Sequence, residues 1–263
     1  MLNYIEISNS NSPISFEEPI SKGGSKLFRE LCINKQSIFS YGPNCETCEF
    51  IINKCNHFSS SITVNELRDI LNHHVEELSG NIINQIQTIL PNGTFGVIQR
   101  NVKPKISSND DFNFSKDYTY YEINKINIAQ MVNISKLENY TYQELNVNEY
   151  ILPIQENIYF NENVIKQYEQ MVLKQNTPCA IAISILEIHG RDNWFTINLL
   201  HFILDGHHKI RAAANTNSSI KLLSFINCEQ EYNILPFIIN HWKHKNDISH
   251  VKKSINYLFA NVV

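Results

Sequence analysis

Hydrophobic and polar positions are most regular in the second half of the chain, where short apolar runs alternate with one amphipathic stretch. The runs are rich in β-branched and aromatic residues and are bounded by turn residues, a pattern typical of β-strands. The amphipathic stretch can begin with Asn161 as its capping residue and continues to about Lys174. The second run is almost continuously apolar, which indicates a strand buried on both faces. The predicted strands are residues 149–154, 179–186, 194–204 and 220–227.

The third predicted strand stops at Asp205-Gly206, and a segment that ends in three helix-forming alanines follows at once. This order predicts a strand, a tight turn and a helix. The turn brings a carboxylate, a glycine, two imidazoles and an ammonium to the N-terminal end of the helix, where amide N–H groups and the helix dipole favour an anion. We therefore predict a phosphate-binding turn. We refer to residues 205–211 as the Asp-Gly turn, whose candidate ligand-binding residues are Asp205, Gly206, His207, His208, Lys209 and Arg211.

The first half of the chain is less regular, and its pattern favours helices. Apolar residues at helical spacing predict a short amphipathic piece around residues 27–31 and a longer helix over residues 63–80, which begins with a capping-box sequence. Residues 81–90 suit a second helix, and residues 94–102 have strand character. Residues 109–148 are polar and rich in tyrosine, and we place a domain boundary near their end.

These patterns predict an α+β protein of two domains. Residues 1–146 form a mixed, mainly helical domain with a cysteine-rich knot, and residues 147–263 form a domain of strands and helices with a C-terminal helical tail. A chain of 263 residues can bury a full core. Its hydrophobic fraction of 43% against 18% charged residues argues against bulk disorder.

Charge and hydropathy narrow the classes of partner. The formal net charge of −4 gives no electrostatic footprint for non-specific nucleic-acid binding, which normally needs a basic face. The first residues lack the basic region and apolar core of a signal peptide, and no apolar run reaches the roughly 18 residues of a membrane span. We therefore expect a cytoplasmic protein without a membrane partner.

Six cysteines raise the question of a metal site. In the cytosol they are expected to be reduced thiols or metal ligands, because that compartment keeps thiols reduced. Two thiolates three positions apart can share a zinc ion, and a further cysteine or histidine can complete a tetrahedral site. Reduced structural cysteines, a zinc site and a redox or iron–sulfur site all stay open. The candidate zinc ligands are Cys45, Cys48, Cys55 and His57, with Cys32 upstream.

The order of elements over residues 147–228 resembles the ParB/sulfiredoxin-like fold. Residues 150–154 correspond to its first strand, residues 164–176 to the helix before the central strand, and residues 178–185 to that central strand. The Asp-Gly turn occupies the place of the family's phosphate-binding turn. The resemblance covers under a third of the chain.

The residues of the turn distinguish among the members of this superfamily. Sulfiredoxins carry a catalytic cysteine where His207 stands here, which argues against a sulfinic-acid reductase. Chromosome-partition ParB proteins have a Gly-Glu-Arg-Arg type turn and a following helix-turn-helix domain, and neither matches this chain. The closest resemblance is to the free-serine kinases, which use an Asp-Gly-His turn followed by a basic residue. In these kinases a glutamate after the first strand is the base, and Glu156 has a comparable place, although Gln155 departs from the usual histidine before it.

The resemblance implies a nucleotide-dependent phosphotransferase for a small hydroxyl-bearing, amino-acid-like substrate, with ATP or ADP and Mg²⁺ as cofactors. Phosphoryl transfer needs positive charge and N–H donors around the transferred group, a metal-binding carboxylate and often a base. Asp205 would contact the metal or the substrate and Glu156 would be the base. The other residues of the turn would contact phosphate, and Arg211 is alternatively a solvated or salt-bridged helix residue. A nucleotide-binding regulatory or adaptor module without turnover and a ParB-like nuclease are the alternatives.

Several residues also have a purely structural interpretation. Asp205-Gly206 can be an ordinary turn with solvated histidines, because short motifs often match by chance. We expect His201, on one face of a predicted strand, to be structural. The tyrosines at positions 118, 120 and 121 either stack on a base or substrate or belong to the core.

Overall fold

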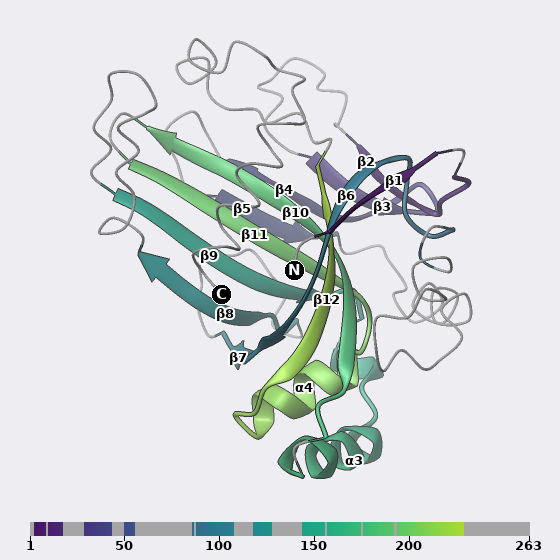
Figure 1. Cartoon of the computed structure of the whole chain (residues 1–263), viewed down its shortest axis with the longest axis vertical. Helices are drawn as coiled ribbons and strands as arrows, with labels where there is room; N and C mark the ends of the chain where they lie inside the picture. Colours follow the sequence, from purple (N-terminus) through teal and green to yellow (C-terminus); the bar gives the residue numbers. More distant parts are fainter. Residues whose placement is uncertain are drawn as a thin grey trace.

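The structure is a computed structural model, and its described part consists mainly of two β-sheets with helices at one end (Figure 1). Helix α3 (Glu162–Leu173) and helix α4 (His207–Asn215) pack against each other there, and a 3₁₀ turn, η1 (Asn157–Tyr159), precedes α3. Within the described residues, no helix has the length and apolarity needed to cross a membrane. The described residues are 3–8, 10–17, 29–43, 50–55, 86, 88–107, 118–127, 144–155, 157–174, 176–191 and 194–228.

The larger sheet has eight strands in the order β1-β6-β12-β10-β11-β9-β8-β7. It is mixed, because β10 runs parallel to β12 and β11 parallel to β9 while the other neighbours are antiparallel. The predicted order of strand, helix, strand, strand, helix and strand over the second half is confirmed by β9, α3, β10, β11, α4 and β12. The strands are β1 (Asn3–Ile7), β6 (Gly93–Val102), β7 (Lys105–Ile106), β8 (Tyr121–Asn127), β9 (Glu144–Pro153), β10 (Cys179–Arg191), β11 (Trp194–Asp205) and β12 (Ile220–Asn227).

The smaller sheet is antiparallel and has the order β2-β3-β4-β5. A two-residue loop joins β3 to β4, and both of its residues, Asn34 and Lys35, have positive φ values of 50° and 65°. Hairpin loops of this kind match the right-handed twist of the strands they connect. The bounds are β2 (Ile14–Glu17), β3 (Arg29–Ile33), β4 (Gln36–Pro43) and β5 (Phe50–Lys54).

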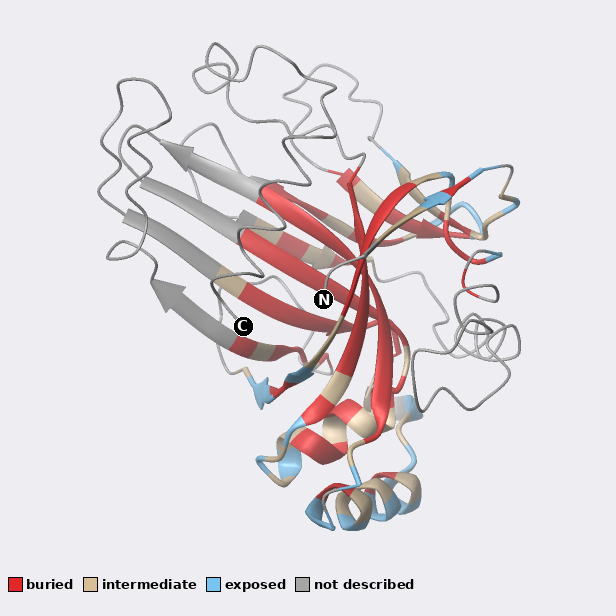
Figure 2. Ribbon diagram, in the orientation of Figure 1, coloured by how far each residue is buried: buried red, intermediate tan, exposed pale blue. Residues whose placement is uncertain are grey.

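The two sheets pack face to face around one core. The centroid of the Phe39 ring on β4 lies 5.1 Å from the centroid of the Phe202 ring on β11. The centroid of the Tyr41 ring lies 6.0 Å from that of Phe202. The opposite face of the larger sheet packs against α4 through Ile210 and Ala213. Figure 2 shows buried residues along the central strands between these layers. The described part of β10 is therefore covered on both faces, as its apolar run predicted.

The prediction of an α+β protein with a mainly helical N-terminal domain is wrong. Most described residues of the predicted N-terminal domain belong to strands β1 to β8 and to the start of β9. The described residues of the piece predicted as amphipathic around residues 27–31 belong to strand β3. Three apolar residues at helical spacing are a weak signal, and pairing with β2 and β4 overrides it. The strand predicted at residues 94–102 is confirmed as β6. Residues 63–80 lie outside the described residues, as do most of residues 81–90.

The larger sheet contains strands from both halves of the chain. The boundary predicted at about residue 146 falls inside β9, and β6 of the first half pairs with β12 of the second along the whole length of β12. Consequently the second-half strands do not form a sheet of their own. Tyr118 and Tyr120 are buried in the core shared by both sheets, in agreement with the structural interpretation of the tyrosine cluster.

Candidate functional site

The Asp-Gly turn joins β11 to α4 at the end of the sheet where the helices lie (Figure 1). Gly206 is the residue before the helix and has φ 99°, a left-handed conformation that side chains rarely adopt. A Cβ atom at this position would lie 2.8 Å from the Ala180 Cβ and 2.9 Å from its Cα. Glycine is therefore required both by the backbone conformation and by close contact with β10. As a glycine, Gly206 makes no side-chain cap to the N-terminus of α4.

Asp205 and Lys209 form an ion pair across the first turn of α4. The Lys209 ammonium lies 3.2 Å from Asp205 Oδ2 and donates a second hydrogen bond, 3.0 Å long, to the Cys179 carbonyl at the start of β10. Both side chains keep some exposure, 11% for Lys209 and 15% for Asp205. The turn thus presents a carboxylate and an ammonium that are held in place and still reach solvent.

The two histidines of the turn accept hydrogen bonds from backbone amides. His207 Nε2 accepts from the Gln155 N–H at 3.2 Å, and His208 Nε2 accepts from the Asn161 N–H at 2.9 Å. An imidazole nitrogen can accept only when it carries no proton, so both contacts require the Nε2 atom to be unprotonated. His207 is buried, whereas His208 is partly exposed. Each imidazole thereby holds one part of the connection between β9 and α3 against α4.

Arg211 lies one helical turn further along α4, beside Tyr121 of β8. Burial raises the pKa of Tyr121 to about 12, and the neighbouring Arg211 guanidinium opposes this rise. The contact with Tyr121 favours the alternative interpretation of Arg211, in which it is a helix residue with a structural partner, over a role in binding phosphate.

The predicted base, Glu156, lies outside the described residues, but the residue before it does not. Gln155 follows the end of β9, donates its backbone N–H to His207, and donates from its side-chain Nε2 to the Tyr159 carbonyl at 2.7 Å. Two segments that the sequence analysis singled out, 52 positions apart, therefore meet in space. The contact is made by the His207 ring, which was predicted to bind phosphate and here accepts a hydrogen bond from the Gln155 backbone.

The predicted zinc ligands are described only in part. Cys45, Cys48 and His57 lie outside the described residues, while the Cys55 sulfur lies 3.1 Å from the Ser37 hydroxyl. Within the described ranges, no three histidine, cysteine or acidic side chains gather as a metal site would require. Burial raises the pKa of Cys32 to about 12, so this cysteine is a thiol at neutral pH. The zinc site stays a prediction.

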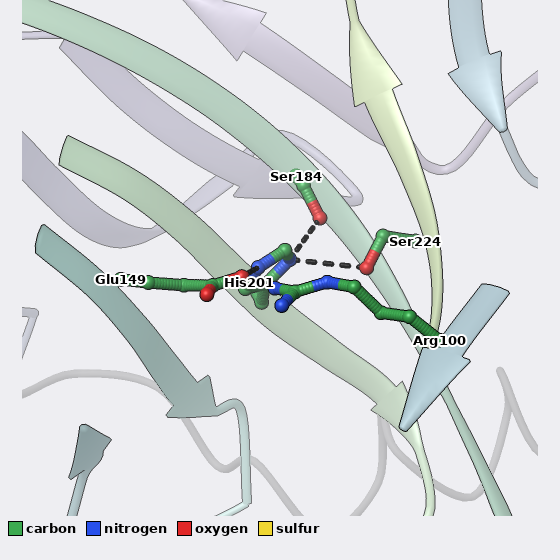
Figure 3. Close-up of polar contacts among 5 residues, drawn as sticks. All are labelled: Arg100, Glu149, Ser184, His201 and Ser224. Atoms are coloured by element: carbon green, nitrogen blue, oxygen red, sulfur yellow. Dashed lines mark hydrogen bonds and ion pairs between the residues drawn. The ribbon is translucent and has the colours of Figure 1, made fainter. Parts of the chain in front are cut away.

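A buried polar network that was not predicted from the sequence crosses the larger sheet. His201 Nδ1 lies 2.7 Å from the Ser184 hydroxyl and 3.1 Å from the Ser224 hydroxyl, and Nε2 lies 2.7 Å from Glu149 Oε1. The Arg100 guanidinium forms an ion pair with the same carboxylate (Figure 3). We call these five residues the histidine network. They come from the five adjacent strands β6, β12, β10, β11 and β9.

Burial determines the protonation of the histidine network. Desolvation, with a further contribution from Arg100, holds the pKa of His201 well below its usual range, so the imidazole is neutral. Its Nε2–H then donates to Glu149, and Nδ1 accepts from a serine hydroxyl. Burial lowers the pKa of Arg100 to about 10, which leaves the guanidinium charged at neutral pH.

The order serine, histidine, glutamate has the form of a hydrolase relay, yet both serines and His201 are fully buried. A substrate could not reach Ser184 in this state, so the network agrees with the structural role expected for His201. A sequence signal did exist: Ser184, His201 and Ser224 each interrupt an apolar strand. Only the strand register, which places them on one face, shows that they meet.

Comparison of the chain with protein-family models, with curated proteins and with solved structures gives no match.

Proposed function

We propose that the Asp-Gly turn binds a nucleotide phosphate and that the protein is a nucleotide-dependent phosphotransferase for a small hydroxyl-bearing, amino-acid-like substrate. The observation that carries the proposal is the hydrogen bond between the Gln155 N–H and His207. It joins the turn to the residue directly before Glu156. If the protein acts as the free-serine kinases do, Glu156 must lie beside the Asp-Gly turn, and this hydrogen bond brings its chain neighbour there.

Two features of the turn favour an anion. Gly206, the residue before α4, has no side chain that could cover the helix N-terminus, and amides at a helix N-terminus attract phosphate. The Lys209 ammonium lies within the same turn and keeps some exposure. Phosphoryl transfer depends largely on positioning and on positive charge around the transferred group, and Lys209 together with these amides suits that requirement.

The residues of the turn fit a magnesium nucleotide. Mg²⁺ is commonly bound by one or two carboxylates together with phosphate oxygens and water, so Asp205 alone would suffice as the protein ligand. When bound, the magnesium nucleotide would supply the phosphoryl group and neutralise its charge. Asp205 would orient this complex, Lys209 would contact the phosphate, and Glu156 would accept the proton of the substrate hydroxyl.

The test is magnesium-dependent nucleotide turnover in the presence of serine and related hydroxyl amino acids. Glu156→Gln should lower turnover by about 10²-fold or more, because a positioned base contributes on that scale. Asp205→Asn should lower it by about 10²-fold, because misplacing the nucleotide by about 1 Å costs that much. Glu162→Gln, which changes an exposed acid in the first turn of α3, is the matched control and should retain turnover. Equal rates in all four proteins would refute the proposal. Binding of nucleotide without turnover would favour a regulatory or adaptor module instead.

A further inference from the structure

Three consecutive residues at the end of β9 each have a backbone group bound by a side chain from elsewhere in the fold. The Tyr118 hydroxyl donates to the Pro153 carbonyl at 2.9 Å, and the Lys54 ammonium donates to the Ile154 carbonyl at 3.1 Å. The Gln155 N–H donates to His207 at 3.2 Å. We call residues 153–155 the β9 end. The three side chains come from β5, from the residues before β8, and from α4.

Lys54 is an unusual choice for such a contact. Its side chain comes from the smaller sheet and is buried, and its ammonium lies 4.6 Å from the centre of the Tyr118 ring and 6.0 Å from that of Phe39. Burying an ammonium is costly, and its contacts with aromatic faces and its charge-assisted hydrogen bond to the Ile154 carbonyl offset this cost. A charge-assisted hydrogen bond is stronger than a neutral one, so Lys54 holds the Ile154 carbonyl more firmly than a neutral donor would.

The contacts form a continuous path from the smaller sheet to the Asp-Gly turn. Lys54 binds the Ile154 carbonyl, the next residue donates its N–H to His207, and His207 begins α4 directly after Gly206. On its other side the turn rests on β10, through the close approach of Gly206 to Ala180. Because β10 and Gly206 leave little freedom on that side, the position of the β9 end determines how the first turn of α4 is oriented.

We propose that Lys54, supported by Tyr118, is a positioning residue for the Asp-Gly turn. The smaller sheet, which carries Lys54, thereby helps to set the geometry of the site. This inference rests on the proposed function for its effect on catalysis. Its structural content is independent: removing the ammonium loosens the β9 end and releases His207 from its backbone partner.

The variants are Lys54→Met, which keeps an unbranched apolar stem and removes the charge, and Lys54→Arg, which retains a donor and the charge. Tyr118→Phe removes a single hydroxyl and provides a second route should Lys54→Met fail to fold. Lys103→Met removes an exposed ammonium next to β6 and is the matched control. The first readouts are amide hydrogen exchange at Gln155 and the ¹⁵N spectrum of the His207 ring, which reports whether Nε2 accepts a hydrogen bond.

We expect the rate of amide exchange at Gln155 to rise about tenfold in Lys54→Met and less in Tyr118→Phe. Local opening of the β9 end would then no longer have to break the hydrogen bond that the variant lacks. The His207 ring should lose its preference for an unprotonated Nε2, while Lys54→Arg restores part of both signals and Lys103→Met changes neither. In Lys54→Met, kcat should fall by roughly 10²-fold, because misplacing the residues of the Asp-Gly turn by about 1 Å costs on that scale, while the KM for substrate should stay nearly unchanged.

The outcomes separate the two proposals. A wild-type protein without turnover refutes the phosphotransferase, and the exchange and ¹⁵N readouts then decide the inference alone: loosening in Lys54→Met and Tyr118→Phe supports it. Unchanged exchange and an unchanged His207 ring in both variants overturn it. An active enzyme whose β9 end loosens while kcat stays at the wild-type value also overturns it, because the contacts would then only hold the fold.

Discussion

Arg100 on β6 forms an ion pair with Glu149 on β9, although three strands lie between them in the sheet. Neighbouring strands lie about 4.8 Å apart, so four spacings in a flat sheet would separate these two strands by roughly 19 Å. The two side chains could not span that distance. The pair therefore requires the sheet to curl, so that β6 approaches β9 across the face that carries His201 and the two serines (Figure 3). The strand order agrees with this, because β7 follows β6 in the chain and pairs with β8, the neighbour of β9 (Figure 1).

The first prediction concerns this pair. Glu149→Gln removes the carboxylate that pairs with the buried Arg100 guanidinium and accepts a hydrogen bond from His201. The substitution should lower the free energy of unfolding by about 3–5 kcal/mol, the usual cost of breaking a buried ion pair. The double variant Arg100→Met with Glu149→Gln should cost less than the sum of the single variants, because no charge is then left buried. Urea unfolding measures both. Glu6→Gln on the exposed side of β1 is the control, and strict additivity of the two single effects would contradict the prediction.

The second prediction concerns pH. Burial holds the pKa of His201 below its usual value near 6.5, so the folded state binds fewer protons than the unfolded state once the pH falls below about 6.5. The stability that follows from neutral His201 is fully present above that pH and decreases as the pH falls towards the folded pKa, by about 1.4 kcal/mol per pH unit. His201→Asn should lack this contribution. The difference in unfolding free energy between wild type and variant, measured from pH 8 to pH 4.5, should narrow towards acid, whereas parallel curves would contradict the assignment.

Sequence reasoning succeeded where local signals and tertiary structure agree. Asn161 has a short polar side chain before an apolar stripe, and it caps α3 as predicted. Asp205-Gly206 ends an apolar run before three alanines, and β11 and α4 meet there. These signals depend on residues close together in the chain, which a single sequence displays.

The smaller sheet and the histidine network depend on partners far apart in the chain. Leu31, Cys32 and Ile33 form an apolar run of only three residues, which does not distinguish a strand from a helical turn until β2 and β4 pair with them. Similarly, Ser184 and His201 face each other only through the register of β10 and β11. A one-residue shift of that register would move either side chain to the opposite face. For the same reason the hold of Lys54 on β9, across a hundred positions, has no sequence signal.

The third prediction concerns the cap of α3. The Asn161 side-chain oxygen accepts from the N–H groups of Asn163 and Val164, at 3.0 Å and 3.4 Å. Asn161→Ala should therefore cost about 1 kcal/mol of stability, as for other helix N-caps. Asn161→Asp retains the acceptor and adds a charge that the helix dipole favours, so its stability should equal or exceed that of wild type. Chemical denaturation of the three proteins tests the order, and equal losses in both variants would show that the side-chain oxygen does not cap the helix.

The last prediction separates the two reasons for glycine at position 206. Gly206→Ala combines a left-handed backbone, with φ 99°, and a clash in which the new Cβ would lie 2.8 Å from the Ala180 Cβ. Asn217, with φ 51° and an exposed side chain, offers the backbone effect with little crowding. Asn217→Ala should cost on the order of 1 kcal/mol, and Gly206→Ala should cost about 1–3 kcal/mol more, because overpacking adds to the strain. Thermal unfolding gives both values. A loss at Gly206 no larger than that at Asn217 would mean that β10 can move away from the turn, and the Asp-Gly turn would then lack the rigid support on which the role of Lys54 depends.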